Sequence, residues 1–382
     1  IYNEDYEGNR DFGTAKMPQE IAQKAIDYLA EHSSSHFAVT FYGGEPLANF
    51  PLVRWATEYT LEHYKDKHPT FNLTTNLTLV TDEIADFLAR TPGFSVVVSL
   101  DGPEEVQNAA RVYSANKPTF ADAMRGLNTL SKAFIKHGKS LTINSVLIPP
   151  YTYEKLERIN SFFESLDFLP PLTQCMITYP SPGTFPVENA VELMSGNPTY
   201  EFGAALNPLL KWQFEKAKQN GLSWEHTQNI YFNTMLKMME TIDGRMVTDA
   251  PDDLYHCNGC CVPGSRKLYV KANGDLLICE RIGSSPIIGN IFTGIDKTLL
   301  SEKYDTEYVA RSLPACKNCW AVNLCPICYA NCYTEDGIDP AEKASNCNGV
   351  RSQLERCFSM FYELLEENPS ALDALKETTR SS

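Results

Sequence analysis

The cysteines are the residues whose spacing points most directly to chemistry. The chain has 12 cysteines, and 11 of them fall within residues 257–357. In the run CKNCWAVNLCPIC, Cys316 and Cys319 form one CxxC pair, and Cys325 and Cys328 form another. Short CxxC spacing lets two thiolates converge on one metal centre from a single turn, and distant cysteines complete a set of four ligands. The block therefore predicts metal ligation.

Three interpretations of this block differ in what the thiolates bind. Disulfide frameworks are typical of short secreted chains, whereas this acidic chain has 382 residues and no signal-peptide pattern in its first residues. Zinc held by four cysteines uses the same short spacings as iron–sulfur clusters. The spacing by itself therefore leaves structural zinc and iron–sulfur clusters equally compatible with the sequence.

A second candidate site is the tetrapeptide Gly43-Gly44-Glu45-Pro46, which directly follows an apolar run. Glycines at a strand end let the backbone approach a ligand closely, and Glu45 would place a carboxylate at the rim. A tight turn with a solvated glutamate is the alternative, because four residues alone are a weak motif.

Apolar runs alternate with amphipathic stretches through residues 1–180. Strands are expected at 36–44, 71–76, 94–102, 140–148 and 173–179, with helices at 17–32, 51–66, 81–89, 119–137 and 152–165. Strands that alternate with such helices form parallel βα units, so the fold class is α/β with a sheet buried on both faces. The chemistry is then expected at the strand ends.

Beyond this region the sequence changes character twice. Residues 181–256 are predicted to be a helical bridging segment, with a long helical stretch at 201–242. Residues 257–368 form a cysteine-rich domain closed by an amphipathic helix over 350–367, and residues 369–382 are expected to be a frayed tail. Cys357, on the closing helix, and the isolated Cys175 are expected to be buried thiols rather than ligands.

The composition limits the partners. The formal net charge of −15 disfavours nucleic-acid backbones and anionic membranes, and no apolar run is long enough to span a bilayer. Dinucleotide-binding, P-loop and serine-hydrolase motifs are absent from the sequence. We therefore expect a cytoplasmic protein that binds neither nucleic acid nor membrane, and a peptide partner is compatible with its charge.

The tetrapeptide at residues 43–46 resembles the GGEP motif of radical S-adenosylmethionine (SAM) enzymes, and the later strand ends at residues 75–76 and 99–103 resemble that family too. The resemblance implies a partial (β/α)6 TIM-like barrel. In the family, GGEP contacts the amino group of SAM, and the following strand ends contact its carboxylate and ribose. The SAM-binding residues implied here are Gly43, Gly44, Glu45, Pro46, Asn76, Ser99, Asp101 and Arg111.

The cysteine pattern, Cys-x12-Gly-x4-Cys followed by CxxC-x5-C and a last cysteine, resembles the SPASM domain of radical SAM peptide and protein maturases. The resemblance implies two auxiliary [4Fe–4S] clusters. By position, one would be held by Cys316, Cys319, Cys325 and Cys347. The other would be held by Cys261, Cys279 and two further thiolates, for which Cys328 is favoured over Cys332 and Cys257 over Cys260.

One departure concerns the family's CxxxCxxC motif, which holds the cluster that cleaves SAM, since no cysteine precedes Cys175. The family's usual spacing would place the third cysteine of that motif just before Ile1, and the first barrel strand would precede it. We therefore expect the motif, its SAM-binding [4Fe–4S] cluster and the strand upstream of Ile1. Genuine loss of the site is the alternative.

These resemblances imply a radical SAM oxidoreductase that modifies a peptide. A 5′-deoxyadenosyl radical would take a hydrogen atom from a ribosomally made precursor peptide, and a flavodoxin or ferredoxin would donate electrons. Thioether cross-linking is the favoured outcome, and formylglycine formation, as in anaerobic sulfatase maturases, is the alternative within the family. A degenerate, non-catalytic metal-binding partner protein is the alternative of another class.

Overall fold

The computed structural model describes residues 15–113, 116–179, 207–245, 261–282 and 284–378. Within these ranges the chain forms two compact units, and each unit is assembled from segments that are far apart in the sequence. The first unit takes residues from 32–240 and 360–378, and the second takes residues from 15–31 and 241–359. The expected boundaries differ from these, because most of the helical segment and the C-terminal residues group with the α/β region.

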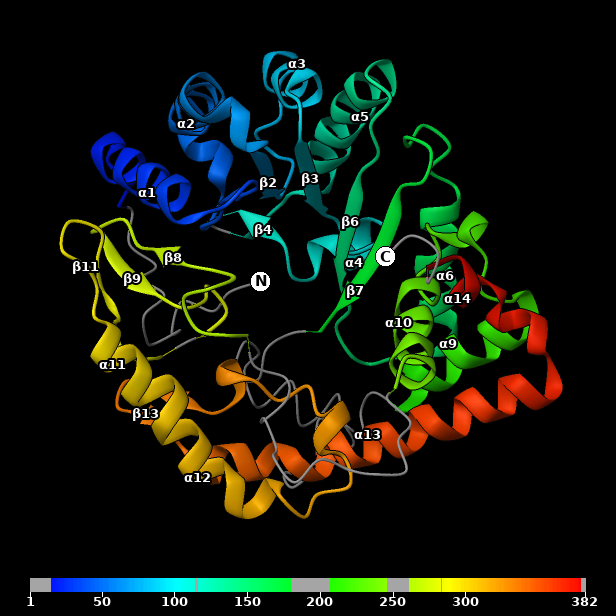
Figure 1. Cartoon of the computed structure of the whole chain (residues 1–382). Helices are drawn as coiled ribbons and strands as arrows, with labels where there is room; N and C mark the ends of the chain where they lie inside the picture. The colour runs from blue at the N-terminus through cyan, green and yellow to red at the C-terminus, as the bar shows by residue number, and fades with distance from the viewer. Residues whose placement is uncertain (1–14, 114–115, 180–206, 246–260, 283, 379–382) are drawn as a thin grey trace. The chain divides into compact units, whose positions relative to one another are not determined.

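The first unit is built around a parallel sheet with the strand order β1-β2-β3-β6-β7 (Figure 1). Its strands are β1 (Ala38–Phe41), β2 (Thr70–Thr75), β3 (Phe94–Ser99), β6 (Thr142–Val146) and β7 (Gln174–Thr178). The connecting helices include α2 (Phe50–Tyr64), α3 (Asp82–Arg90), α5 (Phe120–Lys136) and α6 (Tyr153–Glu164). The expectation of parallel βα units is confirmed.

The core of this unit lies between the sheet and its helices. Phe71 and Val98 on the central strands, and Leu127 and Phe134 on α5, have 0% of their surface exposed. Burying one such side chain contributes about 1.5–3 kcal/mol. Figure 1 shows α2, α3 and α5 on the same side of the sheet. Short elements between them are η1 (Pro46–Asn49), η2 (Lys65–Lys67), α4 (Glu104–Asn108) and the hairpin of β4 (Val112–Tyr113) and β5 (Lys117–Pro118).

The helical stretch expected at 201–242 is interrupted. The described part of it contains α9 (Asn207–Asn220) and α10 (Phe232–Asp243), with the short η4 (Trp224–His226) between them. Gly221 ends α9 with a φ of +73°, a left-handed conformation that glycine adopts readily at a helix C-terminus. The periodicity continued across this break in the sequence, so the break was not predicted.

The frayed tail expected from residue 369 is wrong for residues 369–378. They form η8 (Pro369–Leu372) and α14 (Asp373–Thr378), and Ala371 is 1% exposed. The backbone N–H of Leu222 donates to the carbonyl of Ala371 at 3.1 Å. Small apolar side chains therefore pack this segment into the first unit, and residues 379–382 lie outside the described residues.

The second unit contains helix α1 (Gln19–His32) and the described cysteines of the cysteine-rich region. An antiparallel sheet has the order β11-β10-β9-β8 and consists of β8 (Tyr269–Val270), β9 (Asp275–Leu277), β10 (Gly289–Asn290) and β11 (Gly294–Ile295). It is followed by α11 (Lys297–Ser301), the π-helical turn η5 (Glu302–Thr306) and α12 (Glu307–Cys316). The turns η6 (Val322–Leu324) and η7 (Tyr329–Asn331) and the hairpin of β12 (Tyr333–Thr334) and β13 (Gly337–Ile338) come next.

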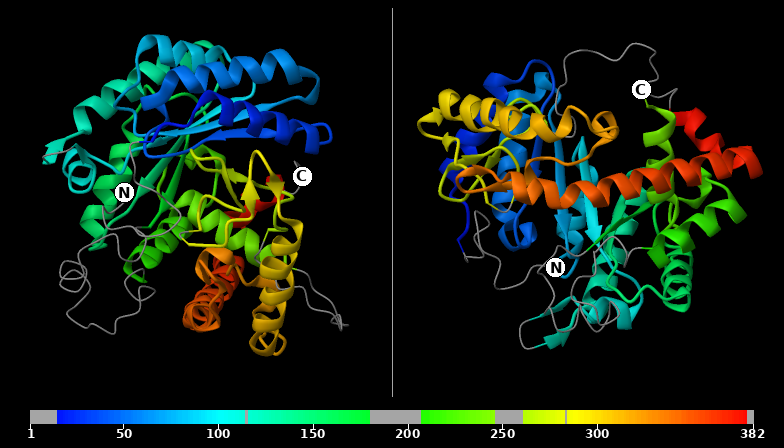
Figure 2. Two further views of the ribbon diagram at one scale, coloured as in Figure 1. Left: turned by 90° about the vertical axis from the view of Figure 1, so that its left-hand side faces the viewer. Right: turned by 90° about the horizontal axis from the view of Figure 1, so that it is seen from below.

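The closing helix α13 (Pro340–Glu367) begins ten residues before the expected start at residue 350, so it also carries Lys343 and Cys347. Figure 2 shows α12 and α13 alongside each other, and side-chain hydrogen bonds join the two helices. No helix among the residues described is both long and apolar enough to cross a bilayer.

Candidate functional site

The GGEP segment follows β1 and leaves open space in front of its backbone. Gly43 has a φ of +154°, in a region that L side chains rarely adopt. A Cβ added at Gly43 or Gly44 would meet no heavy atom within 4 Å. Side chains at these two positions would therefore fill this space rather than clash with the protein, so the glycines keep room for a ligand beside the backbone.

Glu45 joins the ends of β1 and β2. Its Oε1 accepts hydrogen bonds from the backbone N–H of Leu47 at 3.0 Å and from the Thr75 hydroxyl at 2.9 Å, and its Oε2 accepts from the Asn76 N–H at 2.7 Å. Burial raises the pKa of Glu45, although the donors from Asn76, Leu47 and Thr75 act in the opposite direction. A carboxylate has about four acceptor positions, so one remains on Oε2.

The end of β2 is a constrained turn. Asn76 Oδ1 accepts hydrogen bonds from the N–H and hydroxyl of Thr78, at 3.1 and 2.8 Å. The next residue, Leu77, is fully buried and adopts a φ of +71°, which is unfavourable for a leucine. A Cβ at Gly126 of α5 would lie 2.1 Å from the Leu77 carbonyl oxygen, so this turn requires a glycine on the neighbouring helix.

The end of β3 holds Ser99 and a fully buried Asp101. Both carboxylate oxygens of Asp101 have protein partners, because Oδ1 accepts from the Val146 N–H at 2.9 Å and Oδ2 accepts from Arg111 Nε at 2.7 Å. This pair is a largely buried, charge-assisted hydrogen bond. Asp101 therefore fixes the Arg111 guanidinium relative to the ends of β3 and β6.

The second unit gathers four cysteines around one cavity of about 210 Å³, lined by Cys316, Cys319, Cys325, Cys347, Lys343, Arg351 and apolar side chains. These are the four cysteines expected to share one auxiliary cluster. They come from the end of α12, the loop after it, and α13. Burial raises the pKa of Cys325, as do the neighbouring Cys347 and Cys316, whereas Lys343 lowers it.

The four thiols share the lining of one cavity. Among the described residues, no group of three His, Cys, Asp or Glu side chains is placed to hold one metal ion. A tetrahedral zinc site needs thiolate sulfurs about 2.3 Å from a single centre. The four-thiol cavity has the donor set of an iron–sulfur cluster, which occupies a volume of its own and is held by cysteine thiolates.

Comparison with known proteins identifies the first region. Residues 3–163 match the sequence profile of the Radical SAM superfamily. The chain contains a radical SAM domain. The resemblance carried by the GGEP motif and the later strand ends is thereby confirmed, and the glycine segment, Glu45 and Arg111 all belong to this radical SAM domain.

Relatives of the chain include characterised and uncharacterised proteins. An uncharacterised protein of Methanocaldococcus jannaschii is 29% identical over 278 residues, which cover 72% of this chain and 79% of that protein. The serine-type anaerobic sulfatase-maturating enzyme of Bacteroides thetaiotaomicron is 31% identical over 131 residues, or 34% of this chain and 31% of that enzyme. The chain thus matches about a third of the length of that enzyme.

A solved structure of anSMEcpe with bound AdoMet and Kp18Cys peptide has a similar fold. The TM-score is 0.65 at 19% identity, with 98% of this chain and 94% of that chain covered. The expected fold class, a radical SAM α/β domain followed by a cysteine-rich C-terminal domain, is confirmed.

The cysteines outside the four-cysteine cavity differ in how deeply they are buried. Cys261 is exposed, Cys279 and Cys328 are half-buried, and Cys332 is 1% exposed within a core that includes tyrosines. Burial raises the pKa of Cys279. Cys257 and its competitor Cys260 lie outside the described residues. Cys175 and Cys357 are buried as expected, and burial raises the pKa of Cys357 to about 11.

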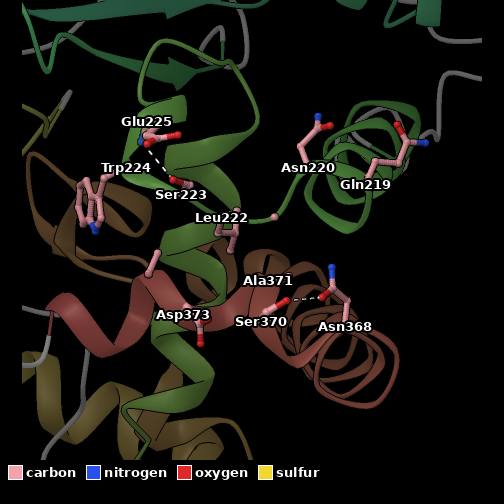
Figure 3. Close-up of a pocket in the computed structure, with 12 residues that line it drawn as sticks. Gln219, Asn220, Leu222, Ser223, Trp224, Glu225, Asn368, Ser370, Ala371 and Asp373 are labelled. Carbon is pink, nitrogen blue, oxygen red and sulfur yellow. Dashed lines mark hydrogen bonds between the residues drawn. The ribbon is translucent and has the colours of Figure 1, made fainter.

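A second cavity, of about 520 Å³, contains none of the predicted site residues. It is lined by residues 219–225 and by parts of 368–374, and Figure 3 shows Ser370 beside Asn368 and Ser223 beside Glu225. These neighbours hydrogen-bond to each other, at 2.7 Å for Ser370 and 3.3 Å for Ser223. We place the functional site elsewhere, because this cavity is lined neither by thiols nor by residues of the GGEP turn.

Lys343 and Arg351 were not singled out from the sequence, and Thr75 was named only as part of a strand end, without a role. Thr75 reaches Glu45 across neighbouring strands, and Lys343 and Arg351 face the cysteine cavity from α13. Lys343, Cys347 and Arg351 are spaced by four residues, which places them on one face of a helix. That spacing could have revealed the two cations if the helix had been predicted to begin before residue 350.

Proposed function

We propose that the protein is a radical SAM maturase that takes a hydrogen atom from a ribosomally made peptide, with thioether cross-linking as the favoured outcome. The observation that carries the proposal is the four-cysteine cavity in a chain with a radical SAM domain. Auxiliary clusters in addition to the SAM-cleaving site would give such an enzyme an acceptor for the electron of a product radical, or a site for a substrate thiolate.

The radical SAM domain offers residues suited to SAM. The open space at Gly43 and Gly44 would admit the methionine end, and the remaining acceptor of Glu45 would receive its ammonium group. Asn76 and Ser99 stand at the ends of the next two strands. Since both Asp101 oxygens have protein partners, we assign Asp101 the role of positioning Arg111, whose remaining guanidinium nitrogens would face the ligand.

The second unit offers the thiolates for auxiliary clusters. Cys316, Cys319, Cys325 and Cys347 would hold one cluster, and their shared cavity supports the assignment of these four thiolates to one site. Cys261, Cys279 and Cys328 would contribute to the other, with Cys257 as the fourth ligand. The burial of Cys332 within an apolar core supports the choice of Cys328.

Bound SAM and its iron–sulfur cluster would supply the radical chemistry needed to take a hydrogen atom from the substrate. The chain's own residues bind and orient: Glu45 holds the turn after β1 against the end of β2, and Asp101 holds Arg111.

We propose a cytoplasmic location, a precursor peptide as substrate and a flavodoxin or ferredoxin as electron donor. The anSMEcpe structure, which contains a bound peptide, supports a peptide substrate by its similar fold.

Formylglycine formation is the second candidate. The serine-type sulfatase-maturating enzyme of Bacteroides thetaiotaomicron and the cysteine-type enzyme of Clostridium perfringens favour it by their similarity to 34% and 40% of the chain. A non-catalytic metal-binding partner protein is the candidate of another class. The two enzyme candidates can be distinguished by incubating the protein with peptides encoded beside its gene. Mass spectrometry then shows whether the product contains a thioether or a formylglycine.

The intact protein, reconstituted anaerobically, should bind and cleave SAM. Glu45→Ala should weaken SAM binding in calorimetric titration and leave the iron content of the cysteine-rich unit unchanged, because the two sites lie on separate elements. Gly43→Val should weaken binding for a different reason, by filling the open space and straining the backbone. Unaltered SAM affinity in both variants would make GGEP a structural turn, and absence of SAM cleavage by the intact protein would favour the partner-protein candidate.

A further inference from the structure

Lys343 is a buried cation whose identified partners are neutral. Its side chain is on α13, and the residue is 6% exposed. The ammonium donates to the Tyr308 hydroxyl at 2.9 Å and to the Ser312 hydroxyl at 2.7 Å, and it lies 4.2 Å from the centre of the Tyr308 ring. Hydroxyls and an aromatic face orient an ammonium but do not cancel its charge.

No carboxylate of the described residues forms an ion pair with Lys343. The acidic side chain of α12 is Glu307, five residues before Ser312, and it pairs instead with Lys303 at 3.1 Å and Arg311 at 3.0 Å. Burying a charge is costly unless an opposite charge compensates it. Lys343 lines the four-cysteine cavity, so an anion in that cavity would supply the compensation.

Arg351 is a second cation on the same wall. It follows Lys343 by eight residues along α13, with the ligand candidate Cys347 midway between them. Its Nη1 donates to Cys319 Sγ at 3.9 Å, and its Nη2 donates to Asn348 Oδ1. Among the described residues Arg351 also forms no ion pair with a carboxylate. A guanidinium that points at a ligand sulfur interacts with the cluster most directly through that sulfur.

Because an iron–sulfur cluster is charged, the two nearby cations would affect its reduction potential. A [4Fe–4S] cluster with four thiolate ligands is anionic, and reduction by one electron adds a further negative charge. Nearby positive charge and hydrogen bonds to sulfur therefore stabilise the reduced state more than the oxidised state and raise the reduction potential.

We propose that Lys343 and Arg351 are the counter-ions of the cluster held by Cys316, Cys319, Cys325 and Cys347, and that they raise its reduction potential. The proposal rests on the proposed function, because it requires a cluster in this cavity. The two cations would adjust the reduction potential of the cluster without binding its iron. Helix α13 would then supply both one cluster ligand, Cys347, and the two positive charges beside the cluster.

The test is a potentiometric titration of the intact, anaerobically reconstituted protein, monitored by electron paramagnetic resonance. The signal of this cluster is the one that disappears in a Cys325→Ser variant. Lys343→Met and Arg351→Gln each remove a charge while keeping much of the side-chain length. Arg356→Gln is the matched control, because Arg356 is on the same helix, does not line the cavity, and bonds to the Ser352 carbonyl.

We expect the midpoint potential to become more negative in Lys343→Met and in Arg351→Gln, to fall further in the double variant, and to be unchanged in Arg356→Gln. Iron and sulfide contents should match those of the parent. Equal midpoint potentials in parent and double variant, with the cluster present, would overturn the proposal and leave the proposed function intact. A parent without this signal would overturn both.

The Lys343→Met protein could lose its fold because two hydroxyls lose their donor. Circular dichroism and thermal unfolding check this, and Arg351→Gln then carries the test, because Arg351 is at the cavity wall and less buried. Arg351→Lys keeps the charge without the guanidinium geometry, and we expect it to restore most of the lost potential. An Arg351→Lys protein with the same potential as Arg351→Gln would contradict a role for charge.

Discussion

Glu45 shows how one carboxylate can hold a turn in place and still keep one acceptor position for a ligand. Three of its acceptor positions hold the turn after β1 against the end of β2, through Leu47, Thr75 and Asn76. The position that remains is the one available to a ligand. The protein therefore orients the carboxylate before any ligand arrives, which reduces the entropy that binding must remove.

Glu45→Gln should destabilise the first unit by about 1–3 kcal/mol, the usual effect of leaving a buried hydrogen-bonding group unsatisfied. The amide oxygen can replace Oε1, but the amide NH₂ would then face the Asn76 N–H, and two donors cannot bond to each other. Urea denaturation measures the change. Glu83→Gln is a suitable control, because Glu83 is on the surface and should have little effect.

The pH dependence of the same variant has a definite sign. Burial raises the pKa of Glu45 in the folded state. Because the folded-state pKa of Glu45 is higher than its unfolded-state pKa, folding favours the protonated carboxyl. The resulting contribution of Glu45 to the free energy of unfolding is complete below the unfolded-state pKa, and it is lost as the pH rises through the folded-state pKa. Glutamine does not titrate, so the stability advantage of the wild type over Glu45→Gln should narrow over that window. Denaturation at a series of pH values checks this, and an advantage that widens would contradict it.

At the scale of elements, the end of β2 depends on α5. Leu77 adopts a left-handed conformation, and its carbonyl oxygen approaches Gly126 so closely that no Cβ fits between them. The turn that presents Asn76 is thus held from the helix side as well as by Glu45. Helix packing therefore positions the candidate SAM site, although none of the predicted SAM-binding residues lies on α5.

Gly126→Ala should destabilise the protein by about 1–3 kcal/mol, as overpacking usually does. The sign matters, because glycine to alanine inside a helix normally stabilises by about 0.5–1 kcal/mol. Gly349→Ala is the matched control, since Gly349 lies inside α13 with nothing within 4 Å of an added Cβ, and it should be neutral or stabilising. Thermal unfolding of both variants measures the difference, and two variants of equal stability would contradict the close approach.

The sequence predicted the parallel strands to within a few residues, because buried apolar runs and the helices between them leave clear local patterns. It did not predict the break at Gly221, because a glycine inside a helical pattern is ambiguous until its φ is known. The sequence pointed to Thr75 only as part of a strand end, and it did not point to Lys343. Their roles depend on contacts between elements, with Glu45 and with the cysteine cavity, which no local pattern records.

At the scale of the whole molecule, the proposal divides the chemistry between the radical SAM domain and the cysteine-rich unit. Cys325→Ser should remove about four irons and four sulfides from the anaerobically purified intact protein, since it would delete one ligand of the proposed cubane cluster. Cys357→Ala is the control, because Cys357 is buried on the same helix as Cys347 and should leave the metal content unchanged. Metal and sulfide analysis decides, and zinc without sulfide in the parent would refute both the cluster and its redox role.

Both units draw on early and late parts of the chain, and this affects how the protein is made. Helix α1 contributes Ile21 to a core whose other members include Leu276 and Tyr333, and the first unit takes in the last described segment through Ala371. The first unit therefore cannot be completed until residues 360–378 have been synthesised. The cysteines of residues 261–347 leave the ribosome before that segment, so the candidate cluster ligands are made while the first unit is still unfinished.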